Sequence, residues 1–137
     1  MARDEGYLEA ESRIEEARRA RSTNLDLRNL KLTEVPAAIA SLTQLQTLDL
    51  SRNQLTEIPK AIASLTQLQT LNLHKNQLTE LPDAIASLNQ LQSLDLSQNK
   101  LTELPEAIAS LTQLQSLTPF PLKKYTFRLR QKCVLKF

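Results

Sequence analysis

The sequence predicts an α/β solenoid in which short parallel strands stack side by side and an N-terminal helix covers the first of them. Three observations predict this fold. A 23-residue unit recurs in register along most of the chain, leucines alternate with polar residues at each expected strand, and an amphipathic segment rich in charge precedes the first unit. With 137 residues, the chain has the length of one domain.

The repeat is visible in the string AIASLTQLQTL, which begins at Ala38 and again at Ala61. It returns as AIASLNQLQSL from Ala84 and as AIASLTQLQSL from Ala107. Written from the strand, the unit is LxxLxLxxNxLxxLPxxIxxLxx. This pattern resembles the leucine-rich repeat family over about residues 22–118. The resemblance implies about five right-handed coils with their parallel strands on the concave face.

Within one unit, the strand has an apolar side and a polar side. Leu48 and Leu50 flank Asp49, so an extended chain points both leucines to one face and Asp49 to the other. One coil cannot bury its own leucines. Coils that stack with their strands about 4.8 Å apart bury the leucines between them. The stack is therefore expected to form a continuous core.

The turn after each strand carries an asparagine and then a proline. The amide of Asn53 can satisfy backbone groups as the chain turns inward, and its copies Asn76 and Asn99 predict a ladder of such amides. A proline excludes a regular helix directly after the turn and favours an extended or 3₁₀ return. These prolines are Pro59, Pro82 and Pro105.

Residues 1–21 are predicted to form a capping helix. Apolar residues at spacings of three and four make one stripe along it. The stripe comprises Tyr7, Ala10, Ile14 and Ala17. Glutamates gather early and arginines late, which suits the helix dipole. In the first coil, Ser22 replaces the expected leucine and Leu30 the expected asparagine, as is typical of a terminal repeat.

A narrower resemblance begins at Tyr7, with YLEAESRIEEARRARSTNLDLRNLKLTEVPAAI. This stretch is similar to the start of the repeat region in bacterial Roco-type proteins, where a helix rich in Glu, Arg and Ala leads into the first coil. The resemblance covers about a quarter of the chain. It implies that this chain is the repeat portion of such a protein, or a short relative, and that a parent protein would add a Ras-like GTPase domain and a dimerising domain.

The composition argues against an enzyme. Gly6 is the only glycine, which excludes the glycine-rich loops that cradle phosphates. His74 is the only histidine and Cys133 the only cysteine, and nothing brings a nucleophile, a base and an orienting group together. We expect no catalytic residues and no cofactor. Because the sequence shows neither a secretory signal nor a membrane-spanning stretch, we expect a cytoplasmic protein.

A column of carboxylates and one amide runs across the predicted strands. It comprises Asp26, Asp49, Asn72 and Asp95. Calcium requires about six to eight oxygen ligands at about 2.3–2.6 Å, and strands about 4.8 Å apart offer too few. We therefore expect no metal site and interpret the column as solvated.

The polar face of the strands is the candidate surface for a protein partner. Its residues change from coil to coil while the leucines do not, as expected if one set meets partners and the other meets the core. A purely solvated surface is equally compatible with this variation. The predicted protein-binding residues on this concave face are Arg28, Asp49, Arg52, Asn72, His74, Lys75 and Asp95.

Residues 119–137 depart from the repeat. Pro119 and Pro121 interrupt the parallel ladder, and the segment carries six lysines and arginines but no acid. Alternation over its last eleven residues predicts a strand with a largely apolar face. That strand would lie across the open end of the last coil, which contains Leu111, Leu114 and Leu117, and would pair with a second copy to give a homodimer.

The residues predicted to mediate self-association are Phe127, Leu129, Leu135 and Phe137. Three alternatives remain open. The basic tail could contact the acidic capping helix of another chain and build filaments. It could bind nucleic acid or an anionic membrane, which are the less favoured partners. It could also be the product of a shifted or truncated reading frame, in which case its alternation is accidental.

Overall fold

The computed structural model describes residues 4–118 of the chain. In this part, an α-helix, α1 (Glu5–Ala20), is followed by strands that alternate with short 3₁₀ helices. The strands are β1 (Asn24–Asp26), β2 (Thr47–Asp49), β3 (Thr70–Asn72), β4 (Ser93–Asp95) and β5 (Ser116–Thr118). The 3₁₀ helices are η1 (Ala37–Ser41), η2 (Lys60–Ser64), η3 (Asp83–Ser87) and η4 (Glu106–Ser110).

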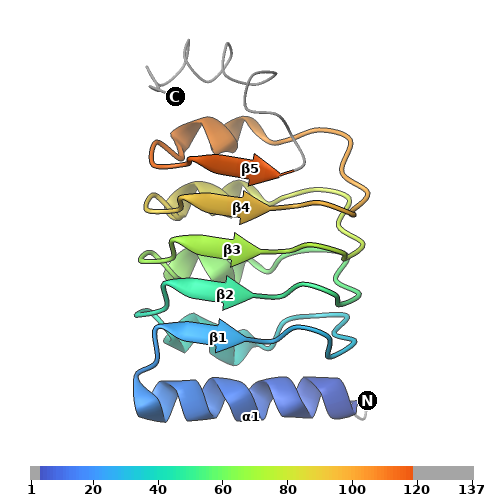
Figure 1. Cartoon of the computed structure of the whole chain (residues 1–137), viewed down its shortest axis with the longest axis vertical. Helices are drawn as coiled ribbons and strands as arrows, with labels where there is room; N and C mark the ends of the chain where they lie inside the picture. Colours follow the sequence, from blue (N-terminus) through green and yellow to red (C-terminus); the bar gives the residue numbers. More distant parts are fainter. Residues whose placement is uncertain (1–3, 119–137) are drawn as a thin grey trace.

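The strands form one parallel sheet in chain order, β1 to β5. Each residue pairs with the residue 23 positions later, as Leu48 does with Leu71, so the sequence period is the register of the sheet. Figure 1 shows the strands stacked one above another, with the 3₁₀ turns behind them and α1 at the end next to β1. The predicted α/β solenoid with an N-terminal capping helix is confirmed.

The core is a stack of aliphatic side chains between the sheet and the 3₁₀ helices. Leu48 and Leu50 of the second coil have no exposed surface, and their equivalents in the third coil, Leu71 and Leu73, are buried equally. Pro59 lies at the N-terminal boundary of η2, and a proline occupies the same place before each of the other 3₁₀ helices. The predicted 3₁₀ return after the turn is confirmed.

The asparagine ladder holds neighbouring turns together. The Oδ1 atom of Asn53 accepts hydrogen bonds from the backbone N–H groups of Leu30 and Leu32, at 3.0 and 2.9 Å. Its Nδ2 donates to the carbonyl oxygens of Leu27 and Leu50, both at 2.9 Å. Asn76 and Asn99 repeat this arrangement one and two coils further on, each reaching back to the preceding coil. The predicted ladder is present.

Helix α1 is fixed to the first coil at several points. Asp4 caps its N-terminus by accepting a hydrogen bond from the N–H of Tyr7 at 2.8 Å. Three of the four predicted stripe residues are buried, and Tyr7 is partly buried against the core. Arg13 donates to the carbonyl oxygen of Asp26 at 2.9 Å, which ties the helix to β1.

At the C-terminal end of the described residues, the leucines differ in how far they are buried. Leu111, Leu114 and Leu117 are buried. Two leucines that follow β4, Leu101 and Leu104, are only partly buried. The predicted self-association residues of the tail lie outside the described residues. Within residues 4–118, no helix is long and apolar enough to cross a membrane.

Candidate protein-binding face

The parallel register aligns the polar residues of successive coils into columns. We call these columns together the strand face, which corresponds to the predicted concave face. The columns are, in order along each coil, Asn24, Thr47, Thr70 and Ser93; Asp26, Asp49, Asn72 and Asp95; Arg28, Ser51, His74 and Ser97; and Asn29, Arg52, Lys75 and Gln98. The strand pairing aligns Asp49, Asn72 and Asp95 in one column, and the other four predicted binding residues follow the strands at matching positions of their coils.

The carboxylate column has a structural role beyond solvation. The Oδ1 atom of Asp49 accepts a hydrogen bond from the N–H of Ser51, two residues later, at 2.9 Å. Asp26, Asn72 and Asp95 make the same bond to the backbone two residues ahead. Asp and Asn are suited to this turn because their short side chains reach that N–H group. Asp and Asn both have an Oδ1 atom that can accept this bond, which explains why Asn72 can stand in a column of aspartates.

Two predicted contact residues have a left-handed backbone. Arg52 and Lys75 both have a φ of 58°, and Asn29 and Gln98 occupy the same conformation in their coils. This region is uncommon for residues other than glycine, and it recurs in each of the first four coils. The side chains of Arg52 and Lys75 are exposed there, beside the third column.

The charges of the first coil are partly neutralised within the face. Arg28 forms an ion pair with Asp26, with Nη2 and Oδ2 3.1 Å apart. Arg28, one of the cations predicted to contact a partner, is therefore already paired. Arg52 and Lys75 are exposed on the turns of the next two coils. On the strand face, the third coil carries a cation, Lys75, with Asn72 in place of an aspartate.

Two serines that the sequence analysis did not select bond to the aspartates of the strand face, and one of them, Ser51, is itself buried. Ser51 donates its hydroxyl hydrogen to Oδ1 of Asp49 at 2.6 Å, and Ser97 donates to Oδ1 of Asp95 at 2.5 Å. The Oγ atom of Ser97 also lies 2.6 Å from Nδ1 of His74 on the neighbouring coil. The motif Asp-Leu-Ser, which occurs twice, is the signal that could have predicted both serines.

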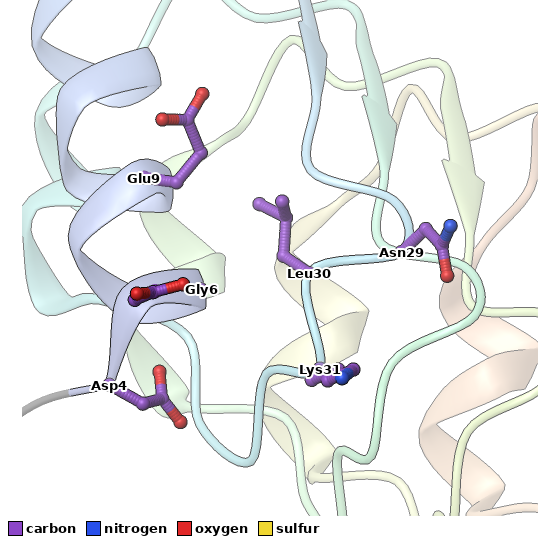
Figure 2. Close-up of a pocket in the computed structure, with 7 residues that line it drawn as sticks. Asp4, Gly6, Glu9, Asn29, Leu30 and Lys31 are labelled. Carbon is purple, nitrogen blue, oxygen red and sulfur yellow. The ribbon is translucent and has the colours of Figure 1, made fainter.

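A separate hollow of about 560 Å³ lies between the start of α1 and the turn after β1 (Figure 2). It is lined by Asp4, Glu5, Gly6, Glu9, Asn29, Leu30 and Lys31. Figure 2 shows the side chains of Glu9 and Leu30 between the helix and the turn. Across residues 4–118, no three His, Cys, Asp or Glu side chains come together in a way that could hold a metal ion.

Comparison with known proteins identifies the repeats. A leucine-rich repeat model matches residues 22–78, and a second model, described as a leucine-rich repeat region, matches residues 62–121. Together they span residues 22–121, which is well over half of the chain. Among curated proteins, none matches.

Two solved structures are similar to this chain. A leucine-rich repeat protein from Leptospira interrogans shares 35% identity with a TM-score of 0.61, over 75% of this chain and 33% of that one. An internalin, inlF, from Listeria monocytogenes shares 36% identity with a TM-score of 0.55, over 61% of this chain and 24% of that one. The chain thus spans about a third or less of the length of each. From its repeats, its parallel sheet and these matches, the chain belongs to the leucine-rich repeat family.

Proposed function

We propose that the chain is a protein-interaction module, or scaffold, that binds a protein partner through its strand face. Leucine-rich repeat proteins typically mediate protein–protein interaction. The observation that carries the proposal is the third coil, where the side chain of His74 is hydrogen-bonded to Ser97 and the exposed Lys75 lies next to it. Side chains fixed by hydrogen bonds lose little freedom on binding, which favours recognition.

The size of the strand face limits the interaction. Five strands about 4.8 Å apart, each three residues long, present a sheet surface of a few hundred Å². A standard interface buries about 800 Å² on each partner. A stable partner would therefore also contact the turns that carry Arg52 and Lys75.

Site-specific photocrosslinking tests this proposal. A photoreactive amino acid is placed at Thr70, on the strand face, and in a matched variant at Ser64, which is exposed on η2. In extract from the source cells, we expect a discrete protein adduct at Thr70 and none at Ser64. Equal crosslinking at both positions, or adducts only at Ser64, would exclude the strand face as the binding surface.

We further propose that copies associate through residues 119–137. In support, Leu101 and Leu104 are only partly buried, whereas Leu78 and Leu81, one coil earlier, are buried. Light scattering on the full-length chain should give a dimer at tens of micromolar, and a chain ending at Leu117 should give a monomer. A full-length monomer would contradict self-association, and growth beyond two chains would favour filaments.

The alternative function, binding of nucleic acid or an anionic membrane by the basic tail, predicts an affinity that falls steeply with salt. Titration of full-length protein with RNA or anionic vesicles at two salt concentrations separates it from partner binding. The cytoplasmic location also remains a prediction. So does the relation to Roco-type repeat regions, which is supported by a charged helix leading directly into the first coil.

A further inference from the structure

The charges of the solenoid are distributed unevenly around each coil. All 15 acidic residues of the chain lie in residues 4–118, against 10 of its 17 lysines and arginines, so this part has a net charge of −5. On the strand face, three carboxylates match three cations, and the loops that lead into β2 to β5 carry no charged residue. The excess negative charge therefore lies on residues 4–21 and on the segments that follow the strands.

The segments that follow the strands stack on one another. The N–H of Gln77 donates to the carbonyl oxygen of Leu55 at 2.8 Å, and the N–H of Lys100 donates to that of Leu78 at 2.9 Å. Figure 1 shows these segments on one side of the stack, where the strand arrows end. They form a continuous flank that is separate from the strand face.

The negative charge of this flank is concentrated on the third and fourth coils. In the first two coils, residues 31–37 and 54–60 each contain one glutamate and one lysine, so their charges cancel. In the next two coils, residues 77–83 and 100–106 contain four acids and one lysine, a net charge of −3. We call these last two segments the acidic flank. Their acids are Glu80, Asp83, Glu103 and Glu106, and their lysine is Lys100.

Three carboxylates of the acidic flank are available to a ligand. The side chains of Glu80, Asp83 and Glu103 are exposed, and they make no hydrogen bond or ion pair within residues 4–118. The other acidic region differs, because two of the six acids in residues 4–21 already pair with arginines of α1. The acidic flank is thus the stronger candidate for binding a basic segment.

Apolar surface adjoins these carboxylates. A hollow of about 470 Å³ lies between the flank segments of the second and third coils. Three acidic side chains and one lysine line it, and Ile58, Pro59 and Pro82 also belong to its lining. Ile58 is buried and both prolines are half-buried, so they close the base of the hollow. A segment that carries both cations and apolar side chains would match this surface.

The chain itself contains a segment of this chemistry. Residues 119–137, the basic tail, carry six lysines and arginines, no acid, and several aromatic and aliphatic residues. The tail begins directly after β5, and the flank segments also begin where their strands end. An extended residue spans about 3.3 Å and neighbouring strands lie about 4.8 Å apart, so the third and fourth coils are within its reach. Attachment to the same chain also gives the tail a high effective concentration at the flank.

We propose that the basic tail docks on the acidic flank of its own chain, with its cations at Glu80, Asp83 and Glu103. This inference goes beyond the proposed function, because it involves neither the strand face nor a second chain. It assigns the basic residues of the tail, whereas the proposed self-association uses the apolar ones. It also makes the flank a competitor of RNA and anionic membranes for the same cations.

The first experiment locates the tail by paramagnetic broadening. Cys133 is the only cysteine, so a nitroxide on the full-length protein is attached within the tail alone. We expect stronger attenuation of the amide signals of Glu80 and Glu103 than of Gln90 and Gln113, which lie on the uncharged loops before β4 and β5. The difference should disappear in about 1 M salt, where the Debye length falls to about 3 Å. Equal attenuation on both sides at low salt would overturn the docking.

The second experiment removes the charges of the acidic flank. The triple variant is Glu80→Gln, Asp83→Asn and Glu103→Gln. Each exposed ion pair changes an equilibrium constant by about 1.4- to fivefold, so the ratio of docked to free tail should fall about three- to a hundredfold. Attenuation at the flank should decrease accordingly, and attenuation that stays unchanged would contradict the proposal.

A matched variant on α1 controls for net charge. It is Glu5→Gln, Glu11→Gln and Glu16→Gln, at three exposed positions. Because it removes the same number of carboxylates away from the flank, we expect the attenuation at Glu80 and Glu103 to be kept. Loss of attenuation in this variant alone would place the tail on the cap helix instead.

Mixed samples separate docking within a chain from docking between chains. Spin-labelled protein without ¹⁵N is mixed with ¹⁵N-labelled protein that carries no spin label, so only contacts between chains attenuate signals. We expect the flank signals to be unaffected. Attenuation as strong as within one chain would place the tail on a second copy and overturn intramolecular docking. A monomer in light scattering would contradict self-association and leave this inference intact.

Discussion

Equivalent residues of the repeat are buried to different extents at the two ends of the described solenoid. At the N-terminal end, α1 covers the first coil, and Leu32 is buried. At the C-terminal end, its equivalent three repeats later, Leu101, is only partly buried, as is Asn99. A repeat unit is therefore stable because of its neighbours, and a terminal unit needs a different structure on its outer side.

The asparagine position shows how the N-terminal end was adapted. Asn53 and Asn76 donate hydrogen bonds back to the carbonyl oxygens of the preceding coil. Before the first coil stands α1 in place of another coil, so an amide there would lack the carbonyl oxygen that the preceding coil supplies to Asn53 and Asn76. Leu30 occupies that position instead and packs against the core. The change from asparagine to leucine follows from what lies next to the coil.

The largest expected effect comes from removing the cap. Deletion of residues 1–20 removes Ile14, whose burial alone contributes roughly 1.5–3 kcal/mol, and exposes the apolar side of the first coil. We expect a loss of several kcal/mol in the free energy of unfolding, measured in urea. Deletion of residues 1–3, which precede the N-cap Asp4, is the control. Equal stability of the two truncations would mean that α1 does not cap the solenoid.

The second prediction compares a central coil with the terminal one. Leu78 and Leu101 occupy the same position in consecutive coils, but only Leu78 is fully buried. Leu78→Ala should cost about 2–5 kcal/mol, since it leaves a cavity in the core. Leu101→Ala should cost clearly less, because its side chain buries less surface. Equal losses in urea unfolding would show that the C-terminal end is packed as tightly as the centre.

The third prediction concerns Gly6, where the helix lies close to the turn after β1. A Cβ atom built on Gly6 would lie 1.8 Å from the carbonyl oxygen of Leu30. Gly6→Ala should therefore displace α1 and cost about 1–3 kcal/mol, despite the better helix propensity of alanine. Ser12→Ala, at an exposed position of the same helix, should change stability by less than about 0.5 kcal/mol. A stabilising Gly6→Ala would exclude this close approach.

These two ends also show what the sequence could and could not predict. Periodicity was sufficient for the coils, because a 23-residue repeat that aligns Leu48 with Leu71 determines the register of a parallel sheet. It was sufficient for the helix, because the apolar stripe has helical spacing. The contact between Gly6 and Leu30 was not predictable, since it depends on the angle at which the helix meets the coil. The bond between His74 and Ser97 joins two coils, and no pattern within one repeat encodes it.

The fourth prediction uses the asparagine ladder. Asn76 is buried, and Asn76→Ala would leave the N–H of Leu55 and the carbonyl oxygens of Leu50 and Leu73 without this partner. We expect a cost of about 1–3 kcal/mol. Gln77→Ala, at the exposed next position, should have little effect. Asn99→Ala should lie between them, since water can replace some of the lost bonds at that end. Equal losses in the free energy of unfolding for all three variants, measured in urea, would contradict the ladder.

The smallest expected effect is the pH dependence of the cap helix. Hydrogen bonds from Arg18 and Arg19, with Arg18 the larger cause, lower the pKa of Glu15 from 4.5 to about 2. A carboxylate whose pKa is lower in the folded state stabilises that state above pH 4.5, and the contribution is lost as the pH falls towards 2. Glu15→Gln should therefore melt at a slightly lower temperature than the unmodified protein at about pH 6, and the difference should shrink as the pH falls. It should also shrink in about 1 M salt, because these ion pairs are exposed and screened. A difference in melting temperature that stays constant from neutral to acid pH would mean that Glu15 acts through the shape of its side chain and not through its charge.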